Sequence, residues 1–313
     1  MLVRRSKKLP DGGNLDLQHL EPGIARLRPA LAEARKRGAI RRTPGARALW
    51  HDAYDDLSEG EPGLAGALLA RSEAQVTRLS LIYALADSAP AIDTPHLQAA
   101  LELWDYSARS IRHLFGNSSG DPDADTITAA LERAPDGLTR SEISALFGRH
   151  ASSGRIDRAL GALLARGGAA PRKEETGGRP VERWVSSHSS LLSRSHWPIP
   201  PSNGVYHGPL GELVHVLEPR TEADPLAVLI QLLVSFGNVV GRTPYVPVEA
   251  DRHYPNLFTV LVGETSKARK GTSWGQARRV SAEVDGAWQE RIMGGLSSGE
   301  GLIAQVSERE ESE

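Results

Sequence analysis

Apolar residues recur at intervals of three and four positions through the first third of the chain. This is the spacing of one face of an α-helix. It predicts helices over residues 17–37, 46–57 and 62–87, and a fourth helix that follows the capping triplet Asp93-Thr94-Pro95. The aromatic residues of these segments fall among the apolar positions. We therefore expect residues 17–116 to form a helical bundle with those aromatic side chains in its core.

The block over residues 121–186 has the outline of a winged helix. Three predicted helices, over 123–133, 140–147 and 154–166, precede two predicted strands that flank a glycine-containing turn. In a winged helix the third helix enters a major groove and the hairpin contacts phosphates. Five basic residues are therefore DNA-binding candidates: Arg155, Arg158, Arg172, Lys173 and Arg179. A winged helix that contacts only proteins is the alternative.

A linker rich in serine and proline, residues 187–203, separates this block from the last one, residues 204–313. The last block begins with predicted helices over 208–218 and 225–238 and a short strand from Val246. Apolar residues then run from Leu257 to Val262, which predicts a buried strand over 256–262 bounded by Gly263.

The predicted buried strand leads into a segment with the parts of a phosphate-binding loop. Backbone amides at a helix start hold phosphate oxygens, a lysine reaches the outer phosphates and a hydroxyl binds Mg²⁺. The candidates are Gly263, Lys270, Gly271, Thr272 and Ser273, ahead of a helix predicted over 272–284. The spacing departs from G-x-x-x-x-G-K-[ST], because Lys270 stands seven positions after Gly263 and the second glycine follows the lysine. A solvated basic turn is the alternative.

Composition describes a chain that can bury a core: 40% of its 313 residues are apolar and 24% are charged. It has no cysteine, which excludes disulfides and thiolate zinc sites. Its longest strongly apolar run, Leu226 to Phe236, is too short to cross a bilayer. The first residues lack the apolar stretch of a signal peptide. We therefore expect a soluble cytoplasmic protein with no membrane partner.

Charge is segregated along the chain although the net charge is −2. Residues 1–50 contain 12 Lys/Arg and 4 Asp/Glu, whereas residues 51–136 contain 5 and 15. Residues 139–185 and 263–279 are again basic, each with a balance of +4. Each basic block could face a polyanion such as DNA, or it could simply solvate a helix face.

Two other kinds of site are tested by their spacing. Gly295-Leu-Ser297-Ser-Gly299 fits the G-x-S-x-G nucleophile elbow, but that site needs a downstream histidine and the last histidine is His253. The ten histidines show no H-E-x-x-H or other metal-binding spacing. Neither a serine hydrolase nor a local metal motif is expected.

Stretches at both ends of the chain resemble one protein family. In the last block they are residues 218–225, 237–242, 249–253, 262–274 and 295–303. In the first two blocks they are residues 3–10, 73–79, 100–106 and 175–180. Together they are similar to the primase-helicase proteins of plasmids, phages and integrated elements, which are replication-type RecA-like ATPases. The phosphate loop, unusual by the general pattern, is similar to the loop of this family.

The family's order is inverted in this chain, because its C-terminal part comes first and the middle of its ATPase is missing. The resemblance therefore implies a mainly α fold with an α/β part. Its expected domains are the end of an ATPase core with a helical bundle (1–116), a winged helix (121–186) and the incomplete first half of a P-loop, RecA-like ATPase (204–313). We favour a rearranged reading frame, which gives an incomplete copy without the second acidic ATPase motif. The alternative is a permuted protein that works beside a partner.

The resemblance also implies roles for single residues, with ATP and Mg²⁺ as cofactors. Lys270 would neutralise the outer phosphates, and Thr272 or Ser273 would bind Mg²⁺. Glu300 would act on the attacking water, and Arg4 or Arg5 would reach the nucleotide of a neighbouring subunit.

We expect an ATP-dependent DNA helicase or primase-associated replication protein of a mobile element, with DNA as its partner. It would form a homo-oligomeric ring or work with a protein that supplies the missing segment. The chain alone is not expected to hydrolyse ATP, because the second acidic motif is missing. The alternative is a winged-helix DNA-binding protein with a vestigial ATPase segment.

Overall fold

The computed structural model of the chain is mainly helical, with short strands in two small sheets. It describes residues 1–116, 120–148, 151–165, 167–174, 181–187, 197–264, 266–290, 292, 299–300 and 303. The expected mainly α class is confirmed. Among the described helices none is long and apolar enough to cross a membrane.

The chain divides into two compact units that interleave along the sequence. Unit 1 comprises Met1–Leu2, Pro44–Thr77 and Leu97–Val205. Unit 2 comprises Val3–Thr43, Arg78–His96 and Tyr206–Glu313. These units do not coincide with the domains expected from the sequence, because two segments of the first 116 residues fold together with the last block.

The helical part of unit 1 contains α2 (Pro44–Ser58), α3 (Gly63–Leu69), the start of α4 (Ser72–Ala86) and most of α5 (Thr94–Phe115). The single helix predicted over 62–87 is wrong, because the chain turns between α3 and α4. The buried hydroxyl of Ser72 donates to the Leu69 carbonyl at 2.7 Å, so it binds the end of α3 instead of continuing the helix.

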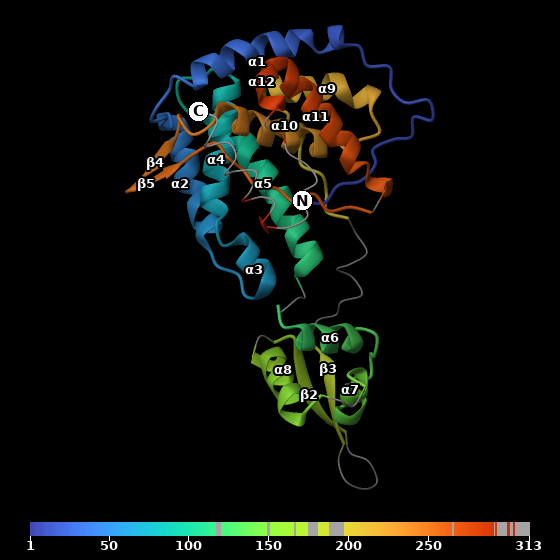
Figure 1. Ribbon diagram of the computed structural model, residues 1–313. Coiled ribbons are helices and arrows are strands. Elements are labelled where there is room, and N and C mark those ends of the chain that lie inside the picture. Colours follow the sequence, from blue (N-terminus) through green and yellow to red (C-terminus); the bar gives the residue numbers. More distant parts are fainter. Residues whose placement is uncertain are drawn as a thin grey trace. The chain divides into compact units, whose positions relative to one another are not determined.

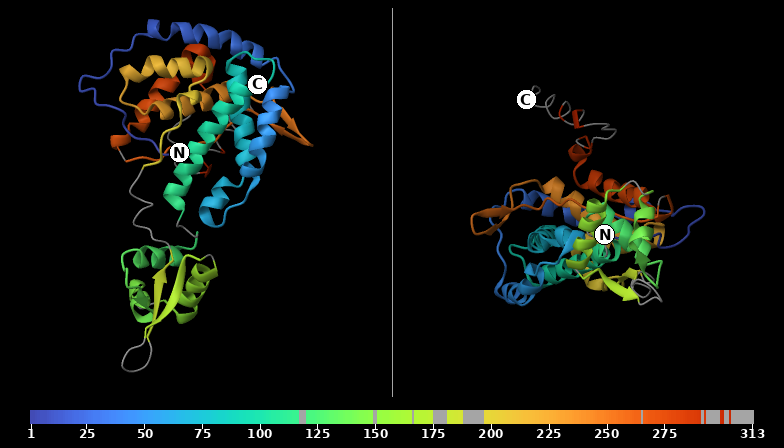
Figure 2. Two further views of the ribbon diagram at one scale, coloured as in Figure 1. Left: turned by 180° about the vertical axis from the view of Figure 1, so that it is seen from behind. Right: turned by 90° about the horizontal axis from the view of Figure 1, so that it is seen from below.

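The rest of unit 1 contains a helix–hairpin subdomain, residues 121–187. Its elements are α6 (Pro122–Leu131), β1 (Leu138–Thr139), α7 (Arg140–Leu146), α8 (Ser153–Ala165), β2 (Ala169–Glu174) and β3 (Val181–Ser186). The strands form an antiparallel sheet in the order β1-β3-β2. Figure 2 (left) shows the hairpin with its three helices. Their common core is apolar and includes Ile127, Ile143, Leu163 and Trp184.

Unit 2 is built around α10 (Pro225–Val240), an apolar helix buried on most of its surface. It packs against α1 (Glu21–Ala34), α9 (Gly208–Leu217) and α11 (Lys270–Val284), and Figure 1 shows α1 lying across these helices. The short helix α12 (Gly286–Gln289) follows α11, and β4 (Val246–Val248) pairs with β5 (Asp251–His253). The helices predicted over 208–218 and 225–238 are therefore confirmed.

The buried strand predicted over residues 256–262 is wrong. Phe258 and Val260 are 88% and 74% exposed, and no described residue pairs with this segment in a named strand. An apolar run becomes a buried strand only when other elements cover its two faces. In the described part of unit 2 the only sheet is the β4–β5 pair, which leaves this segment uncovered.

The start of the chain lies beside the end of that segment. The Val3 amide donates to the Val262 carbonyl at 2.8 Å, and the Arg4 amide donates to the Asp224 carboxylate at 2.9 Å. Asp224 also caps α10 by accepting from the Leu226 amide. Residues from opposite ends of the sequence therefore meet directly before the phosphate loop.

This close approach predicts that Gly263→Ala destabilises unit 2. An added β-carbon would lie 2.3 Å from the Val3 carbonyl oxygen and 2.7 Å from the Ala268 β-carbon. Forcing that volume into packed backbone costs about 1–3 kcal/mol, measured as a lower midpoint of urea unfolding. Gly271→Ala is the matched control, because its β-carbon meets nothing within 4 Å. Equal midpoints for both variants would contradict the packing described.

Candidate phosphate-binding site

The loop between Gly263 and Lys270 ends in a well-defined helix start. A single 3₁₀ turn, Ser266–Ala268, is followed by Arg269 in the left-handed conformation (φ 53°, ψ 32°). Helix α11 then begins at Lys270, two residues earlier than predicted. The first amide to bond within the helix is that of Ser273, which donates to the Arg269 carbonyl. The amides before it are the ones that a helix start offers to an anion.

The side chain of Lys270 folds back over this loop. Its Nζ donates to the Gly263 carbonyl at 2.9 Å and to the Glu264 carbonyl at 3.3 Å. These carbonyls belong to the first residues of the loop, while Lys270 is the last. The ammonium group therefore closes the loop and brings a positive charge to the N-terminal end of α11, where the helix dipole also favours an anion.

The two candidate hydroxyls have different surroundings. Ser273 is fully buried, donates to the Lys270 carbonyl at 2.7 Å and accepts from Gln231 Nε2 at 2.5 Å. Thr272 is exposed beside Gly271 at the helix start. Because the Ser273 hydroxyl already has a donor and an acceptor inside the fold, Thr272 is the hydroxyl that can bind a metal ion with a nucleotide.

A glutamate that the sequence did not single out neutralises part of the loop's charge. Glu222 Oε2 lies 2.6 Å from Arg269 Nε, and Oε1 lies 3.8 Å from an Arg5 guanidinium nitrogen. Glu222 also accepts a bond from the Leu9 amide, and this bond, together with Arg269, lowers the pKa of its carboxyl group. Arg5 is thereby placed beside this chain's own loop. The only sequence signal for Glu222 was its place within the family-like stretch 218–225.

Glu300, the candidate for acting on water, is described and exposed. Residues 293–298, which include Ser297 and Ser298, lie outside the described residues. Within the described part of the chain, Glu300 has no hydrogen bond or ion pair with the phosphate loop. The structure therefore brings Lys270, Thr272 and Arg5 to one region of unit 2 and does not bring Glu300 there.

The basic residues of the helix–hairpin subdomain fall into two groups. Arg155 on α8 forms two short contacts with the Asp123 carboxylate, both 2.5 Å, and these lower the pKa of Asp123. Its charge is therefore already neutralised within the subdomain. Arg158, Arg172 and Lys173 are exposed. Arg179 lies outside the described residues.

The β2–β3 hairpin places two like charges opposite each other. Arg172 pairs directly with Arg183 in the register of the two strands, so both project from the same face. Arg183 is partly compensated by Glu142 at 3.5 Å and by the Gly137 carbonyl at 3.1 Å. Directly opposed like charges destabilise a sheet, and an anion at this face would remove the repulsion.

The different surroundings of the Ser273 and Thr272 hydroxyls predict different effects of their removal on the free energy of unfolding. Ser273→Ala would leave Gln231 Nε2 without its acceptor, which costs about 1–3 kcal/mol in the free energy of unfolding. Thr272→Ala removes only an exposed hydroxyl, and its effect should stay within about 0.5 kcal/mol. Urea unfolding of both variants measures the difference. If Thr272→Ala were the more destabilising change, the assignment of the two hydroxyls would be reversed.

Comparison of this chain with protein-family models, with curated proteins and with solved structures finds no match. The comparisons therefore add no family and no fold relative to the description above. What can be concluded about function depends on the residues of the loop and the hairpin and on their geometry.

Proposed function

We propose that this chain binds ATP with Mg²⁺ at the loop of residues 263–272 and belongs to the replication machinery of a mobile element, as a primase-helicase-type protein. The observation that carries the proposal is the position of Lys270, whose ammonium group closes a loop directly before the exposed first turn of α11. The resemblance of the loop to that of the primase-helicase ATPases suggests that the nucleotide is ATP.

The charges around the loop fit a polyphosphate. Lys267, Arg269 and Lys270 fall within one stretch of four residues, and among the described residues the one acid that forms an ion pair with them is Glu222, through Arg269. A bound phosphate would replace the Gly263 and Glu264 carbonyls as the partner of Lys270 Nζ. Its oxygens would also accept hydrogen bonds from the backbone amides of the first turn, which have no acceptor within the helix.

The proposal is for nucleotide binding by this chain and for hydrolysis only in an assembly. Catalysis of phosphoryl transfer needs an acidic group that holds Mg²⁺ and a residue that positions water. Among the described residues after Lys270, Asp285 is paired with Arg35 at 2.5 Å, and Glu283 lies at the far end of α11. A partner, or another copy of the chain in a ring, would have to supply the missing acid.

Residues of the two family-like blocks meet within unit 2. Val3, from the first block, donates to Val262, from the last block. A permuted protein and a rearranged reading frame that joins two pieces of one ATPase would both retain this pairing. The bond therefore supports a chain in which the two blocks fold together.

Lys270→Ala tests the nucleotide site. Removing the ammonium group should weaken ATP binding at least tenfold, because a charge-assisted contact to the outer phosphates is lost. Isothermal titration with ATP and Mg²⁺ measures the affinity. Lys36→Ala removes an equal charge from α1 of the same unit, where Lys36 pairs only with Glu33 on the surface, and should leave the affinity unchanged. Equal affinities of the two variants and the unchanged protein would refute the site.

A DNA-binding function of the helix–hairpin subdomain is a second proposal, favoured by the Arg172–Arg183 pair. The order α6-β1-α7-α8-β2-β3, with β1 pairing to β3, is typical of a winged helix. The exposed guanidinium group of Arg172, opposite the half-buried Arg183, would contact phosphates, which would relieve the repulsion between the two side chains. This function could operate with or without nucleotide binding in unit 2.

Salt dependence of DNA binding tests this proposal. Arg172→Ala should weaken binding to any duplex and reduce the slope of log affinity against log salt by about 1. Lys173→Ala should reduce the slope less, because Lys173 projects from the opposite face of the hairpin and lies across from Glu182. Arg155→Ala should change the slope less, because Asp123 already neutralises Arg155. Arg47→Ala on α2 is the charge-matched control in unit 1. Unchanged slopes for both hairpin variants would exclude the hairpin as the DNA contact, and Lys270→Ala should not alter DNA affinity.

A further inference from the structure

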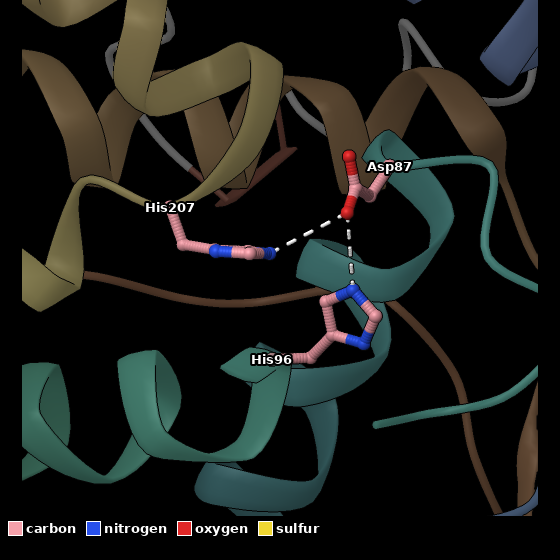
Figure 3. Close-up of side chains that lie close together, drawn as sticks. All are labelled: Asp87, His96 and His207. Atoms are coloured by element: carbon pink, nitrogen blue, oxygen red, sulfur yellow. Dashed lines mark hydrogen bonds and ion pairs between the residues drawn. The ribbon is translucent and has the colours of Figure 1, made fainter. Parts of the chain in front are cut away.

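Three side chains that are distant in the sequence converge in unit 2. Asp87 directly follows α4, His96 lies in the first turn of α5, and His207 directly precedes α9. Asp87 Oδ2 lies 3.3 Å from His96 Nε2 and 3.4 Å from His207 Nε2. All three ligand atoms lie within 4.8 Å of one another. Figure 3 shows both imidazole rings pointing at the same carboxylate oxygen.

The two imidazoles are in states that suit a ligand. His96 is only 4% exposed, and its Nδ1 accepts a hydrogen bond from the Asp93 amide, so this nitrogen carries a lone pair and the ring is neutral. His207 Nε2 is a buried atom that forms no hydrogen bond, even though the carboxylate is near. Arg26 lies 3.6 Å from the other oxygen of Asp87, Oδ1, and leaves Oδ2 to the two rings.

We propose that Asp87, His96 and His207 form a binding site for a divalent transition-metal ion, with Zn²⁺ as the best fit. A zinc ion binds nitrogen and oxygen ligands at about 2.0–2.1 Å, so two ligands at the tetrahedral angle are about 3.3 Å apart. The distances from Asp87 Oδ2 to His96 Nε2 and to His207 Nε2, 3.3 and 3.4 Å, agree with this ligand–ligand separation. Two imidazoles and one carboxylate are a ligand set for zinc and neighbouring metals, whereas Mg²⁺ and Ca²⁺ prefer oxygen ligands alone.

The hydrogen bonds around His96 define what metal binding must change. His96 Nδ1 accepts from the Asp93 amide at 2.9 Å, so the proton of the neutral ring is on Nε2. When Nε2 binds the metal, that proton moves to Nδ1, and the Asp93 amide gives up its bond. The metal site therefore competes with the cap of α5, and its affinity should be weaker than that of a site whose second nitrogen already donates.

Metal binding would link the α4–α5 junction to the start of α9. Residues 87–96 and residue 207 are more than 100 positions apart, and their ligands approach only because both segments belong to unit 2. The ion would therefore stabilise the folded unit, and this effect does not depend on nucleotide or DNA binding.

Cobalt titration tests the site directly. The full chain, freed of metal with a chelator that is then removed, should develop the visible absorption bands of low-coordinate Co²⁺ on titration, and Zn²⁺ should abolish them. Zn²⁺ should also raise the thermal unfolding temperature. His207→Ala should weaken Co²⁺ binding at least tenfold, whereas His215→Ala, an exposed histidine on α9, should leave it unchanged.

Asp87→Asn provides a second variant should His207→Ala not fold. The amide keeps the shape of the carboxylate and removes its charge, so Co²⁺ binding should fall at least tenfold with little change in the far-UV circular dichroism spectrum. Absence of the Co²⁺ bands in the unchanged protein would overturn the proposal. Equal Co²⁺ affinities of the His215→Ala protein and a folded His207→Ala or Asp87→Asn protein would do so as well. The cluster would then be a carboxylate that is hydrogen-bonded to His96 and lies close to His207.

Discussion

The pairing of the chain's start with the residue before the phosphate loop determines the shape of the candidate site. Val3 bonds to Val262, Arg4 bonds to the cap of α10, and Glu222 joins Arg5 to Arg269. The contacts of Val3, Arg4 and Arg5 each join residues more than 200 positions apart. They hold Gly263 against the backbone of Val3 and so fix where the loop begins. The helix start at Lys270 then has a constant position relative to α10.

Unit 2 and the hairpin arrange positive charge differently. At the loop, Glu222 compensates Arg269 within the fold, whereas the partners of Lys270 among the described residues are carbonyl oxygens. On the hairpin, Arg172 lies directly opposite Arg183, and Glu142 lies 3.5 Å from Arg183. Since an unpaired cation gains most from a new anion, Lys270 and Arg172 are the residues at which phosphate would matter most. Arg155, paired with Asp123, is a stabilising residue of the subdomain.

The Asp87–His96–His207 cluster belongs to the same unit as the loop but is built by other contacts. Its residues are at the ends of three helices, where side chains can also bind backbone groups, as His96 does with the Asp93 amide. Because the three residues lie in separate segments of the sequence, no short histidine spacing indicated the cluster. A metal motif on one helix has a fixed repeat, whereas this cluster forms only when residues 87–96 and residue 207 come together within unit 2.

The sequence by itself determined the helices at 208–218 and 225–238, the mainly α class and a helix after the loop, because helical periodicity acts within a few residues. The start of that helix lies two residues earlier than predicted. Tertiary structure decided three other features. It left Phe258 exposed where a buried strand was predicted, since burial requires covering elements that the described chain lacks. It used Ser273 inside the fold and left Thr272 outside. It joined Val3 to Val262 and Asp87 to His207, because pairing between distant segments depends on how the whole unit packs and not on local pattern.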